Sequence, residues 1–156
     1  MLQRILPRTI DNRYRGRKAA LWLFAIIVLL NLVISLSAIF AADGRAQSAD
    51  GIPLNTYGPA AAAAVIGVVA FLGLSDLFLC FFYVLALFRY RAMIPLMYLV
   101  LVVQYPCHKA IGWMKPIARA GPAPGGYVTA GLMALTVVGL LLSLQGRGYT
   151  TDESSG

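Results

Sequence analysis

The sequence predicts an all-α integral membrane protein, a bundle of four membrane-spanning helices. Of its 156 residues, 60% are hydrophobic and only 12% are charged, whereas ordinary soluble domains have about 25% charged residues. The apolar residues are gathered in four stretches, each close to the roughly 20 helical residues that cross a bilayer core. Composition and pattern together exclude an ordinary soluble domain.

The four predicted spans differ in how clearly the sequence marks their ends. The first stretch is longer than the apolar region of a signal peptide, so we expect a permanent anchor. The third contains a polar run with Pro106, which predicts a kink or an early exit from the membrane. A run of Gly and Pro at 121–126 separates it from the fourth. The expected spans are residues 19–42, 60–88, 93–113 and 127–144.

Basic residues predict the orientation of this transmembrane domain, residues 19–145. With the N-terminus inside, nine basic residues face the cytoplasm and four face the other side, so the positive-inside rule places both termini in the cytoplasm. Residues 1–18 form a basic cytoplasmic segment suited to anionic lipid headgroups, and the polar tail 146–156 is expected to be disordered. A tight inner turn at 89–91 makes the second and third spans antiparallel neighbours. The four outer cations are Arg45, Lys109, Lys115 and Arg119.

The sequence shows no signature of a cofactor, nucleotide or metal site. One His cannot supply both axial ligands of a haem, and the two Cys lack Cys-x-x-Cys spacing. Neither glycine-rich nucleotide-binding motif occurs. The net charge of +7 is concentrated before the first span, which indicates membrane orientation rather than nucleic-acid binding. We therefore expect no cofactor, and an enzymatic activity is not indicated.

Polar residues within three spans fall at a common depth. Asp76 is the one acidic residue inside an apolar stretch, where an ionised carboxylate costs about 2.5–3.5 kcal/mol. Asn31, Asp76 and Gln104 each lie about twelve residues from the predicted cytoplasmic boundary, a depth of roughly 18 Å. Helical spacing adds His108 to the face of Gln104. The candidate intramembrane polar pocket consists of Asn31, Asp76, Gln104, Tyr105 and His108.

These polar residues have three interpretations. They can be interhelical contacts of the kind that membrane bundles commonly use for packing, each contributing about 0.6 kcal/mol. They can line a pocket that accepts a proton or a ligand at Asp76, with Asn31 and Gln104 as hydrogen-bonding partners. They can also form a surface that meets a partner protein.

Three short motifs resemble those of a known group of proteins. They are Arg13-Tyr14-Arg15-Gly16-Arg17 before the first span, residues 49–54 in the following loop, and Arg89-Tyr90-Arg91 followed by Pro95. Together they are similar to short proteobacterial four-span proteins that carry no assigned activity. This resemblance covers residues 12–145 and implies a bacterial inner membrane. It assigns no site residue.

The function predicted from these features is that of an accessory or structural membrane protein, acting through membrane partners or self-association. One alternative is a proton-coupled small-molecule carrier in which Asp76 gains and loses a proton. Because 156 residues offer little wall for a gated pathway, that alternative predicts a homo-oligomer. Another is a quinone-associated subunit in which Tyr105 or His108 contacts the ring oxygens.

Overall fold

The computed structural model describes residues 5, 12, 14, 16–121 and 123–145. It confirms an all-α four-helix bundle, and each of the four long helices has the length and hydropathy of a membrane span. The chain is therefore a multi-pass membrane protein. Most of the basic segment and the whole C-terminal tail lie outside the described residues. The long helices are α2 (Lys18–Phe40), α3 (Pro59–Phe88), α4 (Ile94–Met114) and α5 (Pro124–Leu144).

The helix boundaries follow local sequence signals. Prolines occupy the first turns of α3, α4 and α5, where their missing N–H group has no intrahelical partner to lose. Pro106 lies inside α4, yet that helix continues to Met114, one residue beyond the predicted end of the third span. Pro106 therefore does not end the helix. Two short 3-10 helices, η1 (Leu54–Thr56) and η2 (Arg91–Met93), precede α3 and α4.

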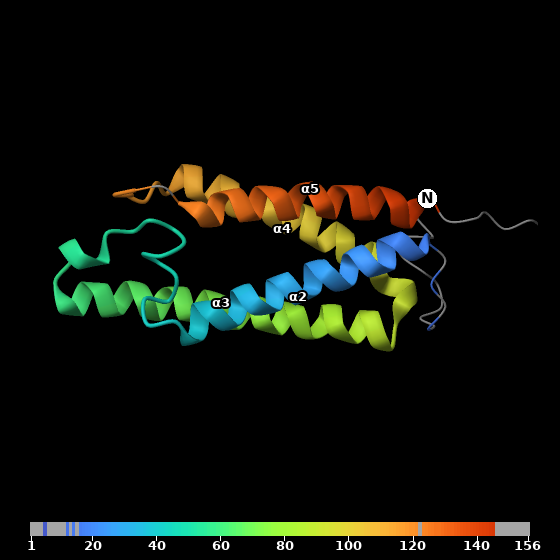
Figure 1. The fold of residues 1–156 in the computed structure, drawn as a ribbon, viewed down its shortest axis with the longest axis horizontal. Helices are drawn as coiled ribbons and strands as arrows, with labels where there is room; N and C mark the ends of the chain where they lie inside the picture. The colour runs from blue at the N-terminus through green and yellow to red at the C-terminus, as the bar shows by residue number, and fades with distance from the viewer. Residues whose placement is uncertain (1–4, 6–11, 13, 15, 122, 146–156) are drawn as a thin grey trace, which may run out of the picture.

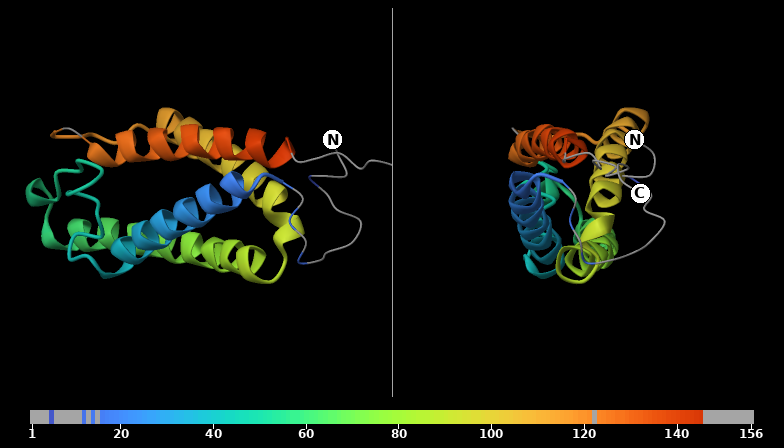
Figure 2. Two further views of the ribbon diagram at one scale, coloured as in Figure 1. Left: turned by 45° about the vertical axis from the view of Figure 1, so that its right-hand side comes forward. Right: turned by 90° about the vertical axis from the view of Figure 1, so that its right-hand side faces the viewer.

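The helices are arranged as two pairs that diverge along the bundle (Figures 1 and 2). We call the end with Lys18 and Leu144 the termini end and the end with Phe40 and Pro124 the loop end. Helix α2 packs along α3 and α5, and α4 packs along α5. Helices α3 and α4 are antiparallel neighbours as predicted, but they touch mainly near η2 and separate toward the loop end (Figure 1).

An aromatic core fills the termini end and the middle of the bundle. The ring of Phe24 on α2 meets the edges of Tyr83 on α3 and Tyr98 on α4, at centroid distances of 6.1 and 5.0 Å. All three side chains are buried, and the Tyr98 hydroxyl donates to the Ala20 carbonyl at 2.7 Å. This core joins α2, α3 and α4 at the half of the bundle where α3 and α4 remain in contact.

The segment 41–58 closes the loop end with a second, smaller core. Ile52 and Leu54 are buried and pack with Ile66 of α3. The same segment accepts two backbone hydrogen bonds: Gly125 N–H donates to the Ala49 carbonyl at 2.9 Å, and Ala120 N–H donates to the Gly51 carbonyl at 3.0 Å. The predicted loop therefore holds α3, α5 and the α4–α5 connection together.

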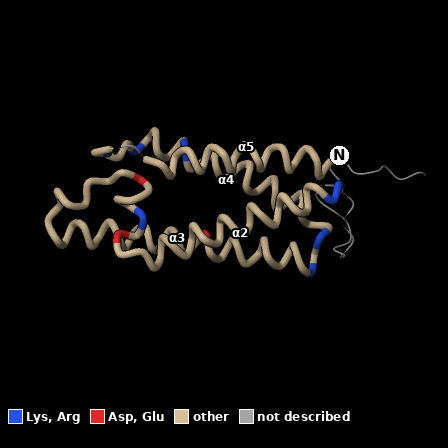
Figure 3. Tube along the Cα trace, viewed as in Figure 1, with Lys and Arg blue, Asp and Glu red and all other residues tan. Residues whose placement is uncertain are grey.

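The basic residues of the described chain lie in two groups, separated along the bundle. Figure 3 shows one group of Lys and Arg at the termini end and a second, looser group on segment 41–58, the later part of α4 and the connection that follows it. This distribution fits a bilayer, because ionised side chains are costly in hydrocarbon. Charges at the loop end come mainly from segment 41–58 and the residues that follow Tyr105.

Candidate functional site

Helices α3 and α4 are joined by a polar contact at mid-depth. The Gln104 side-chain amide donates to Oδ1 of Asp76 at 3.0 Å, and the Tyr83 hydroxyl donates to Oε1 of Gln104 at 3.3 Å. Asp76 and Tyr83 are seven residues apart and so share one face of α3. The structure thus brings Asp76 and Gln104, two of the predicted residues, into contact.

A second pair joins α2 to α4. The Asn31 Nδ2 group donates to the Tyr105 hydroxyl at 3.2 Å, and that hydroxyl lies 3.4 Å from Oδ1 of Asn31. Asn31 Nδ2 also donates to the carbonyl of Ile27 within its own helix at 2.9 Å. Because Gln104 and Tyr105 are consecutive, α4 directs one polar side chain to α3 and the next to α2.

Buried hydroxyl and thiol groups continue this polar layer between α2 and α3. Ser35 Oγ lies 4.0 Å from Cys80 Sγ, and it donates to the carbonyl of Asn31 at 2.9 Å. Cys80 and Cys107 are both free thiols. Within the described part of the chain, no group of three His, Cys, Asp or Glu side chains could hold a metal ion.

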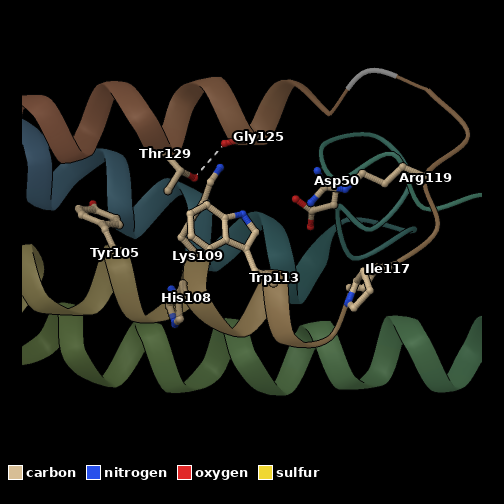
Figure 4. A pocket seen from close by; sticks show the side chains of 12 residues that line it. Asp50, Tyr105, His108, Lys109, Trp113, Ile117, Arg119, Gly125 and Thr129 are labelled. Atoms are coloured by element: carbon tan, nitrogen blue, oxygen red, sulfur yellow. Dashed lines mark hydrogen bonds between the residues drawn. The ribbon is translucent and has the colours of Figure 1, made fainter.

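A cavity of about 400 Å³ lies at the loop end, between α4, α5 and segment 41–58 (Figure 4). Two of the predicted residues, Tyr105 and His108, line it; Asn31, Asp76 and Gln104 do not. His108 is exposed and lies within electrostatic range of Asp76. The cavity is lined by Asp50, Tyr105, His108, Lys109, Gly112, Trp113, Pro116, Ile117, Arg119, Gly125, Gly126 and Thr129.

The candidate residues thus fall into two connected places. Asp76 and Gln104 belong to helix packing, whereas Tyr105 touches both the polar layer and the cavity. Sequence reasoning missed the charged cavity residues Asp50, Lys109 and Arg119. The available signal was the placement of Lys109, Lys115 and Arg119 on the side where the positive-inside rule expects few cations.

The two acids of segment 41–58 have opposite environments. Burial raises the pKa of Asp50, an effect that the charges of Arg45 and Arg119 partly offset. Burial also acts to raise the pKa of Asp43, but hydrogen bonds from Ser48 and from the Arg45 backbone outweigh it, so the net pKa is lowered. The two backbone N–H groups donate to the Asp43 carboxylate at 2.7 and 3.0 Å. Asp43 therefore stabilises its turn when ionised.

This environment predicts an acid-dependent weakening of the loop end. Because the pKa of Asp43 is lower in the folded protein, its contribution is present above its unfolded pKa of about 3.9 and is lost as the pH falls below that value. In a melting series from pH 6 to pH 3, Asp43→Asn should melt below the wild type at pH 6. The difference should shrink toward pH 3. A constant difference would contradict the stabilising role of the ionised carboxylate.

Searches with the whole chain find no matching family model, no matching curated protein and no matching solved structure.

Proposed function

We propose that this protein is an accessory membrane protein, a four-helix scaffold that acts through membrane partners or self-association. One observation carries the proposal: the intramembrane carboxylate of Asp76 is bonded to Gln104 of the neighbouring helix and does not line the cavity at the loop end. A carboxylate held in this way supports helix packing. The same holds for Asn31, which is bonded to Tyr105 across α2 and α4.

The helix faces that stay exposed after this packing support association with other helices. Beyond Tyr105, the described residues 106–121 are all exposed, and this part of α4 stands away from α3 (Figure 1). Large apolar side chains on α3, including Phe71, Phe78 and Phe81, are also exposed. In a bilayer these faces contact either lipid or the helices of a partner, because lipid tails and apolar side chains are equally compatible with them.

The setting proposed for this scaffold is the bacterial inner membrane, with the termini end in the cytoplasm. The positive-inside bias and the resemblance to proteobacterial four-span proteins support this placement. The basic residues before α2 would then contact anionic headgroups of the inner leaflet.

The test compares Asp76→Asn with Asp76→Leu in the purified protein. Asn keeps an oxygen that can accept from Gln104, whereas Leu leaves that amide without its partner. We expect Leu to destabilise the fold by about 1–2 kcal/mol and Asn to have little effect. Thermal unfolding in a mild detergent measures both.

A matched control is Ser75→Leu. Ser75 is exposed on the adjacent position of α3, and within the described residues its hydroxyl donates only to the carbonyl of Phe71 in the same helix. If Asp76→Leu is neutral or stabilising, the fold carries a carboxylate that packing does not require. The proton-coupled carrier would then be favoured, and a monomer in native mass spectrometry from lipid would count against that carrier in turn.

A second candidate function is a quinone-associated membrane subunit. The observation that favours it is that Tyr105 and His108, the residues expected to contact quinone oxygens, line the same cavity. Its test is the amount of quinone extracted from the purified protein, which should approach one molecule per chain.

A further inference from the structure

The proposed scaffold function assigns no role to the charged residues that line the cavity at the loop end. Lys109 and Arg119 line it together with the indole of Trp113 and the apolar side chain of Ile117. Figure 4 shows Lys109 and Trp113 projecting from α4, with Lys109 directed toward α5, and Arg119 projecting from the following connection toward Asp50. The cavity therefore combines two cations with apolar and aromatic walls.

Lys109 is the more informative of the two cations. It lies five residues before the end of α4, about 7.5 Å along the helix axis, inside a segment with the hydropathy of a membrane span. Among the described residues, none forms a hydrogen bond or an ion pair with its ammonium group. A cation at this depth is normally paired or extended toward the interface, so an anion in the cavity would compensate it.

Arg119 stands at the outer side of the same cavity. The charges of Arg45 and Arg119 both act on Asp50. The cavity lining itself holds one carboxylate, Asp50, and two cations, Lys109 and Arg119, so it keeps an excess of positive charge. The backbone N–H groups at the start of α5 are already engaged, since Gly125 donates to Ala49 and Gly126 to Ala123. Recognition of an anion would therefore rest on the side chains of Lys109 and Arg119.

We propose that this cavity binds the phosphate group of an anionic membrane phospholipid. Lys109 and Arg119 contact the phosphate, and Trp113 lies at headgroup level, where indole rings are favoured. The apolar walls accept the first part of an acyl chain toward Tyr105. Basic pockets between membrane helices bind lipid headgroups by this combination of charge and apolar surface. The proposal also accounts for cations on the side where the positive-inside rule expects few.

The experiment titrates the purified full-length protein in neutral detergent with phosphatidylglycerol, using phosphatidylcholine as the zwitterionic reference. The readouts are lipid adducts in native mass spectrometry and the emission of Trp113 in a Trp22→Phe background, which leaves one of the two tryptophans. We expect phosphatidylglycerol to bind about tenfold more tightly than phosphatidylcholine. The double variant Lys109→Gln/Arg119→Gln should abolish that preference.

Two further variants keep the test decisive if the double variant folds poorly. Lys115→Gln removes a cation of the same segment that does not line the cavity, and it should leave the preference unchanged. Asp50→Asn removes the opposing carboxylate and should strengthen phosphatidylglycerol binding by about three- to tenfold, since a unit charge at this range contributes on the order of 1 kcal/mol. A gain of binding cannot result from misfolding.

Other outcomes would overturn the proposal. An equal loss in Lys115→Gln and in the double variant would indicate attraction to overall charge rather than a site. If inorganic phosphate binds and the protein shows no preference between the two lipids, the cavity is a site for a free anion. Stoichiometric quinone in place of phospholipid would assign it to the quinone-associated function.

Discussion

Replacing Gly73 with leucine should separate α2 from α3 and destabilise the protein by more than about 3 kcal/mol. A Cβ atom at this position would lie 2.7 Å from Cβ of Ala38 and 3.1 Å from the backbone oxygen of Ser35. The second contact is with backbone, so no rotamer change relieves it. Helices in membranes approach closely through such small residues, and α2 packs along α3.

The matched control for this prediction is Gly67→Leu on the same helix. A Cβ atom at Gly67 meets no atom within 4 Å, and leucine is a better helix former than glycine by about 0.5–1 kcal/mol. We therefore expect Gly67→Leu to be neutral or slightly stabilising in thermal unfolding. Equal destabilisation by the two variants would show that the glycines act through helix propensity rather than through the close approach of α2 and α3.

The hydropathy of the sequence predicts several of the helix boundaries of this fold. The predicted end of the second span, residue 88, is the observed end of α3, and the third span ends within one residue of prediction. Span ends are predictable because chain hydropathy changes sharply there. The fourth helix begins at Pro124, three residues before the predicted Tyr127, since proline and two glycines are tolerated in a first helical turn.

The pairing of the polar residues was predictable in part. Counting depth along each helix brought Asp76 to the level of Gln104, and the two side chains are hydrogen-bonded. Depth alone does not tell which helices are adjacent at that level. It therefore placed Asn31 beside Asp76, whereas the structure bonds Asn31 to Tyr105.

Helical periodicity could not predict the cavity. Its wall includes Asp50, which belongs to segment 41–58, and that segment folds back against α5 through the hydrogen bond between Gly125 and Ala49. Contacts between a loop and a distant helix leave no periodic signal. The signal in the sequence was the presence of Lys109, Lys115 and Arg119 on the predicted outer side, which by itself indicates charge and not shape.

Gly139 lies close to a side chain of the neighbouring helix rather than to its backbone. Its replacement should therefore destabilise the protein for a different reason. A Cβ atom at Gly139 would collide with the ring of Tyr98, which is fully buried and anchored by its hydrogen bond to Ala20. We expect Gly139→Leu to destabilise the protein by about 3 kcal/mol, measured by thermal unfolding. Gly131→Leu is the control on α5, because a Cβ atom there meets nothing within 4 Å.

Because the obstacle at Gly139 is a side chain, a second substitution should relieve it. Tyr98→Ala alone removes a buried ring and its hydrogen bond, at a cost of about 3–5 kcal/mol by analogy with other aromatic truncations. Combined with Gly139→Leu, the new leucine can occupy part of the vacated volume, so the double variant should be more stable than the sum of the two single effects predicts. The double-mutant cycle measures this coupling. Strict additivity would mean that Gly139 and Tyr98 do not share the contact that joins α4 to α5.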